Sequence, residues 1–282
     1  MKIFPAKFTV AAIAPAGRVP QETLDAGVKI LQTLGADVKV MPHVLDGNPD
    51  LSFLAARDDA RISDLENAWL DPEVDLIWAI RGGYGCARML SQINWERLAV
   101  RNMPLAGFSD ITALHWAMTA KKCGIPCAFP MFKYLSEYDG SMIKMLAEAF
   151  SGKKRCFTLP ALRGGSVSGY PLAGNLTVAA SLCGTPFFPD TADRILFLEE
   201  ISEYPYRIDR TLNQLLMAGA FDRCAGVVFG HFTNSGKPEE IMAVLRDFTR
   251  RVSVPVFHSF QYGHELPFVS LQSDREVTIN SL

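Results

Sequence analysis

The run Pro104-Leu-Ala-Gly-Phe-Ser-Asp-Ile-Thr-Ala-Leu-His-Trp-Ala-Met118 carries an apolar strand directly into an apolar helix. Residues 104–108 have the composition of a buried strand, and residues 111–122 have the apolar spacing of a helix that stops at Gly124. Ser109 therefore falls on a tight strand-to-helix turn, where its hydroxyl would be exposed and backbone N–H groups would receive an oxyanion. A serine that only caps the helix explains the same local sequence equally well.

Strand and helix signals alternate through the first half of the chain. Strand-like runs cover residues 8–14, 38–41 and 75–80, and runs with helical spacing cover 22–34 and 59–70. This alternation predicts an α/β fold with a parallel sheet covered on both faces and sites at the carboxyl ends of its strands. In the second half, strands are expected at 194–198, 226–229 and 255–259.

A change in composition divides the chain. Residues 151–170 combine basic residues, glycine and proline in a mixture typical of a linker. We therefore expect an N-terminal domain at residues 1–150, a linker at 151–170 and a C-terminal domain at 171–282.

The overall composition excludes several classes of function. The 282 residues carry a formal net charge of −2, and no long basic run indicates a nucleic-acid partner. No apolar run is long enough for a membrane span, and the apolar start of the chain is broken by Pro15, unlike a signal peptide. The six cysteines form no C-x-x-C pair, and no spacing typical of metal ligands is present. We expect a cytoplasmic protein with reduced cysteines, no metal and no cofactor.

A glycine-rich loop follows the strand expected at 75–80. It reads Arg81-Gly82-Gly83-Tyr84-Gly85, and it matches neither a phosphate-binding loop nor a dinucleotide fingerprint. Glycines at a strand end let the backbone approach a ligand closely and present N–H groups to an anion. A plain tight turn is the alternative, and a nucleophilic Cys86 just after the loop is disfavoured because no elbow follows it.

Two further stretches supply candidates for acid–base chemistry. Glu199 ends the strand in Leu198-Glu199-Glu200, and a carboxylate there can orient a histidine. His264 in Tyr262-Gly263-His264-Glu265 has the loop context that suits a general base, with His231 as its main rival. His115 lies on the helix after Ser109 and would project away from the turn.

Taken together, these motifs resemble the LD-carboxypeptidase family of serine peptidases. The resemblance extends over nearly the whole chain and includes the turn Ala14-Pro15-Ala16-Gly17 and the segment Gly174-Asn175-Leu176. It implies a flavodoxin-like N-terminal domain, a smaller β-rich C-terminal domain and a homodimer. The pair R-G-G-Y-G and G-F-S-D-I-T, in that order, carries most of its specificity.

The resemblance also implies roles for individual residues. Ser109 would be the nucleophile, His264 the base and Glu199 its partner, with Glu200 as the neighbouring alternative. The oxyanion donors would be the backbone N–H of Asp110 and one N–H from Gly82 or Gly83. Two arginines beside the expected site loops are candidates to hold a substrate carboxylate, because arginine grips carboxylates with paired hydrogen bonds: Arg81 and Arg207.

The implied activity is hydrolysis of the L,D-peptide bond to the terminal D-alanine of a murein tetrapeptide, a step of peptidoglycan recycling. Two alternatives remain open. A microcin C immunity-type hydrolase would use the same triad on aminoacyl-adenylate-like substrates. A non-catalytic binding module is compatible with the fold, but it would not need Ser109, Glu199 and His264 together.

Overall fold

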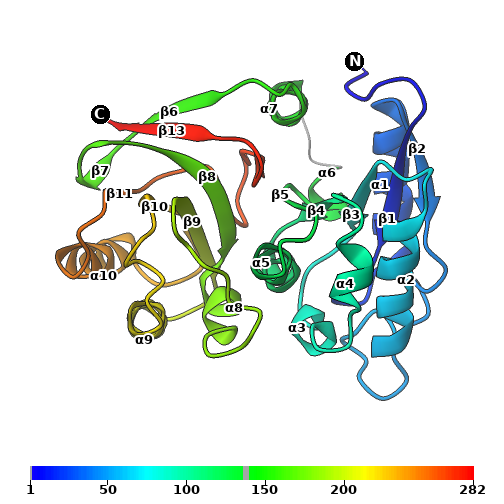
Figure 1. Cartoon of the computed structure of the whole chain (residues 1–282), viewed down its shortest axis with the longest axis horizontal. Helices are drawn as coiled ribbons and strands as arrows, with labels where there is room; N and C mark the ends of the chain where they lie inside the picture. Colours follow the sequence, from blue (N-terminus) through cyan, green and yellow to red (C-terminus); the bar gives the residue numbers. More distant parts are fainter. Residues whose placement is uncertain (1, 136–139) are drawn as a thin grey trace.

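The computed structural model describes residues 2–135 and 140–282. Two sheets lie side by side, each built mainly from one half of the chain (Figure 1). The first sheet has the strand order β12-β5-β4-β3-β1-β2, with only β12 antiparallel to its neighbour. Its strands are β1 (Phe8–Ile13), β2 (Ala36–Val40), β3 (Leu76–Ala79), β4 (Pro104–Gly107), β5 (Ile125–Ala128) and β12 (Leu271–Gln272).

The inner strands β1, β3, β4 and β5 are mostly apolar and buried because helices cover them, whereas the edge strand β2 is largely exposed. All four residues of β3 are fully buried, as expected for a central parallel strand. The helical segments of this half are α1 (Gln21–Thr33), α2 (Asp58–Leu70), α3 (Cys86–Met89), α4 (Trp95–Leu98), the 3₁₀ turn η1 (Ser109–Ile111), α5 (Thr112–Ala120), α6 (Phe132–Leu135) and α7 (Gly140–Phe150). The predicted α/β fold is confirmed.

The second sheet has the order β6-β13-β8-β9-β10-β11-β7 and is parallel at its centre. Its strands are β6 (Arg155–Leu159), β7 (Ala161–Arg163), β8 (Ser166–Asn175), β9 (Arg194–Ile201), β10 (Gly226–Thr233), β11 (Val256–Phe257) and β13 (Val277–Ser281). Three helices connect the central strands: α8 (Leu176–Ser181), α9 (Pro205–Met217) and α10 (Pro238–Arg250).

Residues 151–170, where the composition predicts a linker, contain regular strands. This stretch contains β6, β7 and the first part of β8, and all three strands pair within the second sheet. Gly164 and Gly165 lie in the turn between β7 and β8, and Gly165 has a φ of +146°. The strands β6 and β7 lie at the two edges of this sheet, and the first residues of β8 are largely exposed, which accounts for the polar composition. The division into two domains remains a prediction.

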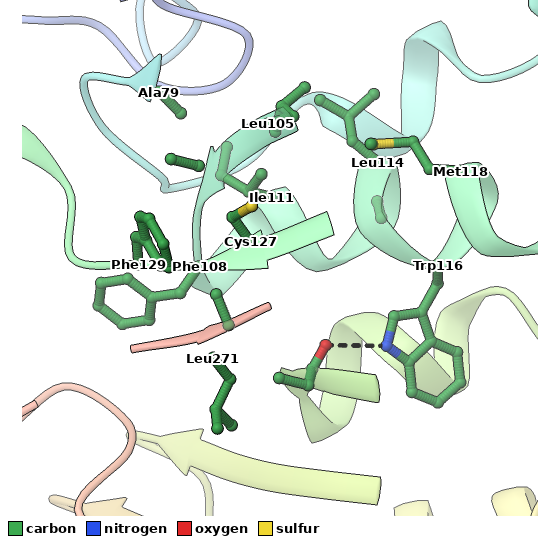
Figure 2. Close-up of a cluster of buried hydrophobic side chains, with 14 of the residues drawn as sticks. Ala79, Leu105, Phe108, Ile111, Leu114, Trp116, Met118, Cys127, Phe129 and Leu271 are labelled. Carbon is green, nitrogen blue, oxygen red and sulfur yellow. Dashed lines mark hydrogen bonds between the residues drawn. The ribbon is translucent and has the colours of Figure 1, made fainter. Parts of the chain in front are cut away.

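Helix α5 joins the two halves and lies between the two sheets (Figure 1). The Nε1 of Trp116 donates to the Ala173 carbonyl at 3.1 Å, and the N–H of Asn175 donates to Thr112 Oγ1 at 2.8 Å. Figure 2 shows this bond of Trp116 next to the buried cluster around Phe108 and Ile111. The start of α5 is therefore held against the end of β8.

Within residues 2–135 and 140–282, no helix is both long and apolar enough to cross a membrane.

Candidate active site

The turn at Ser109 has the strained geometry expected of an exposed nucleophile. Ser109 follows β4 and adopts a φ of +62°, a left-handed conformation that residues with a side chain rarely adopt. Such a conformation costs about 1–3 kcal/mol and persists only where the surroundings impose it. Here the side chains of Phe108 and Ile111 are fully buried on either side of the serine. Phe108 and Ile111 are held in the core, and Ser109 between them is only half-buried.

His264 lies between Ser109 and Glu199. Its Nε2 is 3.1 Å from Ser109 Oγ, and its Nδ1 is 2.8 Å from Glu199 Oε2. With the neutral ring protonated on Nδ1, His264 donates to Glu199 and accepts from the Ser109 hydroxyl. The ring of Phe108 packs 4.9 Å from the imidazole. The structure thus brings together the three residues proposed from sequence.

The two neighbouring glutamates of β9 face different partners. Glu199 is fully buried and reaches His264, and burial raises its pKa while the hydrogen bond from His264 acts in the opposite direction. Glu200 instead accepts from Asn175 Nδ2 at 2.8 Å and from the N–H and hydroxyl of Thr177 at 2.9 and 2.6 Å. Of the two, Glu199 is the carboxylate positioned to orient the imidazole.

The glycine-rich loop lies directly against Ser109. A Cβ built on Gly82 would lie 3.2 Å from Ser109 Oγ, so a side chain at this position would crowd the serine hydroxyl. The carbonyl of Gly82 accepts from the N–H of Gly17 at 3.0 Å. In a planar trans peptide the carbonyl and the N–H point in opposite directions, so the Gly83 N–H points away from Gly17.

Asp110 contributes to the site in two ways. Its backbone N–H lies in the first turn after Ser109, where amide donors have no partner within the helix. Its side chain is buried, which raises its pKa, and Oδ2 accepts from the N–H of Cys86 at 2.8 Å. The carboxylate therefore connects the serine turn to the glycine-rich loop.

The two candidate arginines occupy different surroundings. Arg81 is exposed, and its Nη1 donates to the carbonyl of Arg18 at 2.7 Å, on the loop that also holds Gly17. Arg207 lies on α9, with its Nη1 3.4 Å from Glu203 Oε2 and its guanidinium near two tyrosine rings. None of the contacts described for Arg207 involves Ser109, Glu199 or His264.

The alternative nucleophile and bases are placed less favourably. Cys86 is buried, and its pKa lies well above the ordinary value because of burial and the neighbouring Asp110. His115 donates from Nε2 to the Leu105 carbonyl at 2.9 Å, and burial lowers its pKa to about 4. His231 packs beside Gly263, and its buried Nδ1 has no hydrogen-bond partner among the described residues.

Sequence reasoning missed two residues that shape the site. Phe108 supports the imidazole, and Gly17 holds the Gly82 carbonyl. The turn containing Gly17 contributed to the resemblance, but nothing in its sequence indicated a bond to a loop 65 residues later. In the part of the chain that the structure describes, no group of three or more His, Cys, Asp or Glu is arranged to hold a metal ion.

Comparison with known protein families covers both halves of the chain. Residues 10–129 match the LD-carboxypeptidase N-terminal domain, and residues 168–279 match the LD-carboxypeptidase C-terminal domain. The chain belongs to the LD-carboxypeptidase family. The family resemblance seen in the sequence motifs is confirmed.

Individual members of the LD-carboxypeptidase family match over most of their length. A Streptomyces coelicolor protein, provisionally named a carboxypeptidase, is 36% identical over 90% of this chain and 84% of its own. The murein tetrapeptide carboxypeptidase of Pseudomonas aeruginosa is 29% identical over 90% of this chain and 87% of its own.

Solved structures agree with this assignment. The muramoyltetrapeptide carboxypeptidase of Oxalobacter formigenes superposes with a TM-score of 0.84 at 28% identity, covering 97% of this chain and 95% of that one. The microcin C7 self immunity protein gives a TM-score of 0.85 at 18% identity, covering 98% of this chain and 94% of that one. At that identity, the likeness to the immunity protein concerns the fold alone.

Proposed function

We propose that this chain is a serine carboxypeptidase that hydrolyses the L,D-peptide bond to the terminal D-alanine of murein tetrapeptides. The observation that carries the proposal is the continuous contact from Glu199 through His264 to Ser109, at 2.8 and 3.1 Å. Relatives named as murein tetrapeptide carboxypeptidases support the substrate class. The role would be peptidoglycan recycling in the cytoplasm, by a homodimer, as the family resemblance implies.

The first half of the reaction forms an acyl-enzyme. Ser109 Oγ attacks the carbonyl carbon while its proton passes to Nε2 of His264, because a neutral hydroxyl is a weak nucleophile at neutral pH. The buried carboxylate of Glu199 stabilises the resulting imidazolium. The carbon–nitrogen bond then breaks, His264 gives its proton to the leaving amine, and D-alanine departs.

The second half releases the peptide. A water molecule attacks the acyl carbon and passes its proton to His264. The bond from carbon to Ser109 Oγ breaks, and the serine oxygen takes the proton back from His264. Both tetrahedral intermediates place a negative oxygen beside the serine turn, where the N–H groups of Asp110 and Gly83 would donate to it. Gly83 is preferred over Gly82 because Gly17 fixes the orientation of the shared peptide.

Arg81 is the better of the two candidates for the terminal carboxylate of the substrate. It extends from the loop that contacts Ser109, and no acidic partner is described for its side chain. Arg207 is less suitable, since it lies beside Glu203. Inverting the terminal residue would turn the carboxylate away from Arg81, so the enzyme should discriminate between the two stereoisomers.

The test is chiral amino-acid analysis of the products released from a free murein tetrapeptide. The matched substrate is the same peptide with L-alanine in place of the terminal D-alanine, and the enzyme control is Ser109→Ala. We expect D-alanine from the L,D substrate only, at the same rate in EDTA. Cleavage of both isomers, or loss of activity in EDTA, would contradict the proposal. Hydrolysis of an aminoacyl sulfamoyl-adenylate without cleavage of the tetrapeptide would favour the immunity-type alternative. Sedimentation of the native protein tests the dimer.

A further inference from the structure

We propose that Arg61 is a positioning residue for the oxyanion side of the active site, an inference that rests on the proposed function. Arg61 lies in the first turns of α2, and only 2% of its surface is exposed. A buried arginine is costly unless its charge is paired and its donors are used. Arg61 contacts Pro15 and Gly85, which lie on two loops close to Ser109.

The charge of Arg61 is paired with the carboxylate of Asp58. Its Nη2 donates to Asp58 Oδ1 at 2.5 Å, and Arg88 contacts the same carboxylate, with Nη2 donating to Oδ2 at 2.8 Å. Burial opposes ionisation of Asp58, but the bonds from Arg88 and Arg61 lower its pKa overall. The Arg61 guanidinium is therefore fixed by an ionised partner at the edge of the core.

The same guanidinium holds the turn that contacts the start of the glycine-rich loop. Nη1 of Arg61 donates to the carbonyl of Pro15, the residue that opens the turn containing Gly17. Gly17 in turn holds the Gly82 carbonyl at 3.0 Å. Fixing that carbonyl fixes the direction of the Gly83 N–H, which is the expected oxyanion donor.

The end of the loop rests on Arg61 as well. A Cβ built on Gly85 would lie 2.8 Å from Arg61 Nη1, so the Gly85 backbone packs against the guanidinium. The next N–H, that of Cys86, donates to Asp110 Oδ2 at 2.8 Å, and Asp110 follows Ser109. Arg61 thus supports the Gly85 end of the loop directly and the Gly82 end through the turn containing Gly17, and Cys86 links the loop to the serine turn through Asp110.

These contacts lead to a specific expectation. Arg61 makes none of its described contacts with the triad, so it acts through the backbone donors. Those donors matter most when negative charge develops on the substrate oxygen. Loss of the Arg61 contacts should therefore lower kcat while leaving KM nearly unchanged. Lysine cannot replace it, because one ammonium does not reproduce two donors held in a fixed plane.

The experiment compares Arg61→Lys with Arg101→Lys. Arg101 is a matched control because it also bonds backbone carbonyls, those of Trp69, Asp71 and Val74, in the same half of the chain. For each variant we would measure thermal unfolding, kcat and KM on the tetrapeptide, and the rate of Ser109 labelling by a serine-reactive phosphonate. For Arg61→Lys we expect kcat and the labelling rate to fall at least about tenfold, with KM within about twofold of wild type. Arg101→Lys should lose stability but keep kcat and labelling within about twofold.

Several results would overturn the proposal. A folded Arg61→Lys with wild-type kcat would do so, as would a raised KM at constant kcat or an equal loss of kcat in Arg101→Lys. If Arg61→Lys does not fold, Asp58→Asn provides the test, since it loosens the guanidinium without removing it; unchanged labelling there would also contradict the proposal. If wild type labels rapidly but does not cleave the tetrapeptide, the proposed substrate fails while the role of Arg61 is still tested by labelling.

Discussion

Gly263 lies so close to Glu199 that a Cβ built on it would sit 3.2 Å from the Oε2 atom that accepts from His264. The same Cβ would lie 3.1 Å from the Cβ of His231, and Gly263 adopts a φ of +138°. Both the space and the backbone conformation therefore require glycine immediately before the proposed base. A side chain at this position would crowd the loop that places His264 on Glu199.

Replacing Gly263 by alanine should impair catalysis more than folding. We expect Gly263→Ala to displace His264 and lower kcat on the order of a hundredfold, because small misplacements of reacting groups have effects of that size. Steady-state kinetics and thermal unfolding measure the two effects separately. Gly184→Ala is the matched control, since Gly184 also has a positive φ of +79° but open space around it. If both variants lose activity equally, crowding at Glu199 is not the cause.

Ser109 and His264 should act as one unit. We expect Ser109→Ala to lower kcat on the order of a million-fold, His264→Ala to be comparably severe, and the double variant to be hardly worse. Single-turnover kinetics on the tetrapeptide provides the measurement. His231→Ala is the comparison, because His231 is the neighbouring alternative base. A tenth or more of wild-type activity in Ser109→Ala would remove the serine from its role.

Substitution of Glu199 should mainly affect catalysis, and substitution of Glu200 should mainly affect stability. Glu199→Gln should lower kcat strongly with little change in KM, because an amide cannot stabilise the imidazolium of His264. Glu200→Gln should mainly lower the free energy of unfolding, since Glu200 holds Asn175 and Thr177 at the start of α8. Kinetics and denaturant titrations on the same two proteins distinguish these effects. The reverse pattern would assign the catalytic carboxylate to Glu200.

His115 should make the protein sensitive to acid. Its pKa is lowered from 6.5 to about 4 by burial, so the unfolded chain binds a proton in this range that the folded chain does not. Stability is therefore complete above 6.5 and is lost as the pH falls towards 4. The loss between about pH 7 and about pH 5 should be about 2 kcal/mol. His115→Gln, which keeps a donor for Leu105, should remove that part of the pH dependence in denaturant titrations; an unchanged slope would contradict it.

Local patterns predicted the strand and the helix on either side of the serine turn. The apolar run before Ser109 and the helical spacing after it predicted the elements now seen as β4 and α5. At residues 151–170, the polar, glycine-containing composition that predicts a linker belongs to the edge strands β6 and β7 and the start of β8. A strand buried on both faces is recognised from its own residues, whereas an edge strand is defined by the partner that it pairs with.

By itself, the sequence determined the family, the fold class and the candidates Ser109, Glu199 and His264. Only the tertiary structure decided that Glu199 rather than Glu200 reaches the imidazole, and that His264 rather than His231 reaches the serine. The Ser109–His264 contact joins residues 155 positions apart, and the His264–Glu199 contact joins residues 65 apart. Contacts of that range depend on how the two sheets pack around α5, and no local periodicity encodes the distance between two side chains on different loops.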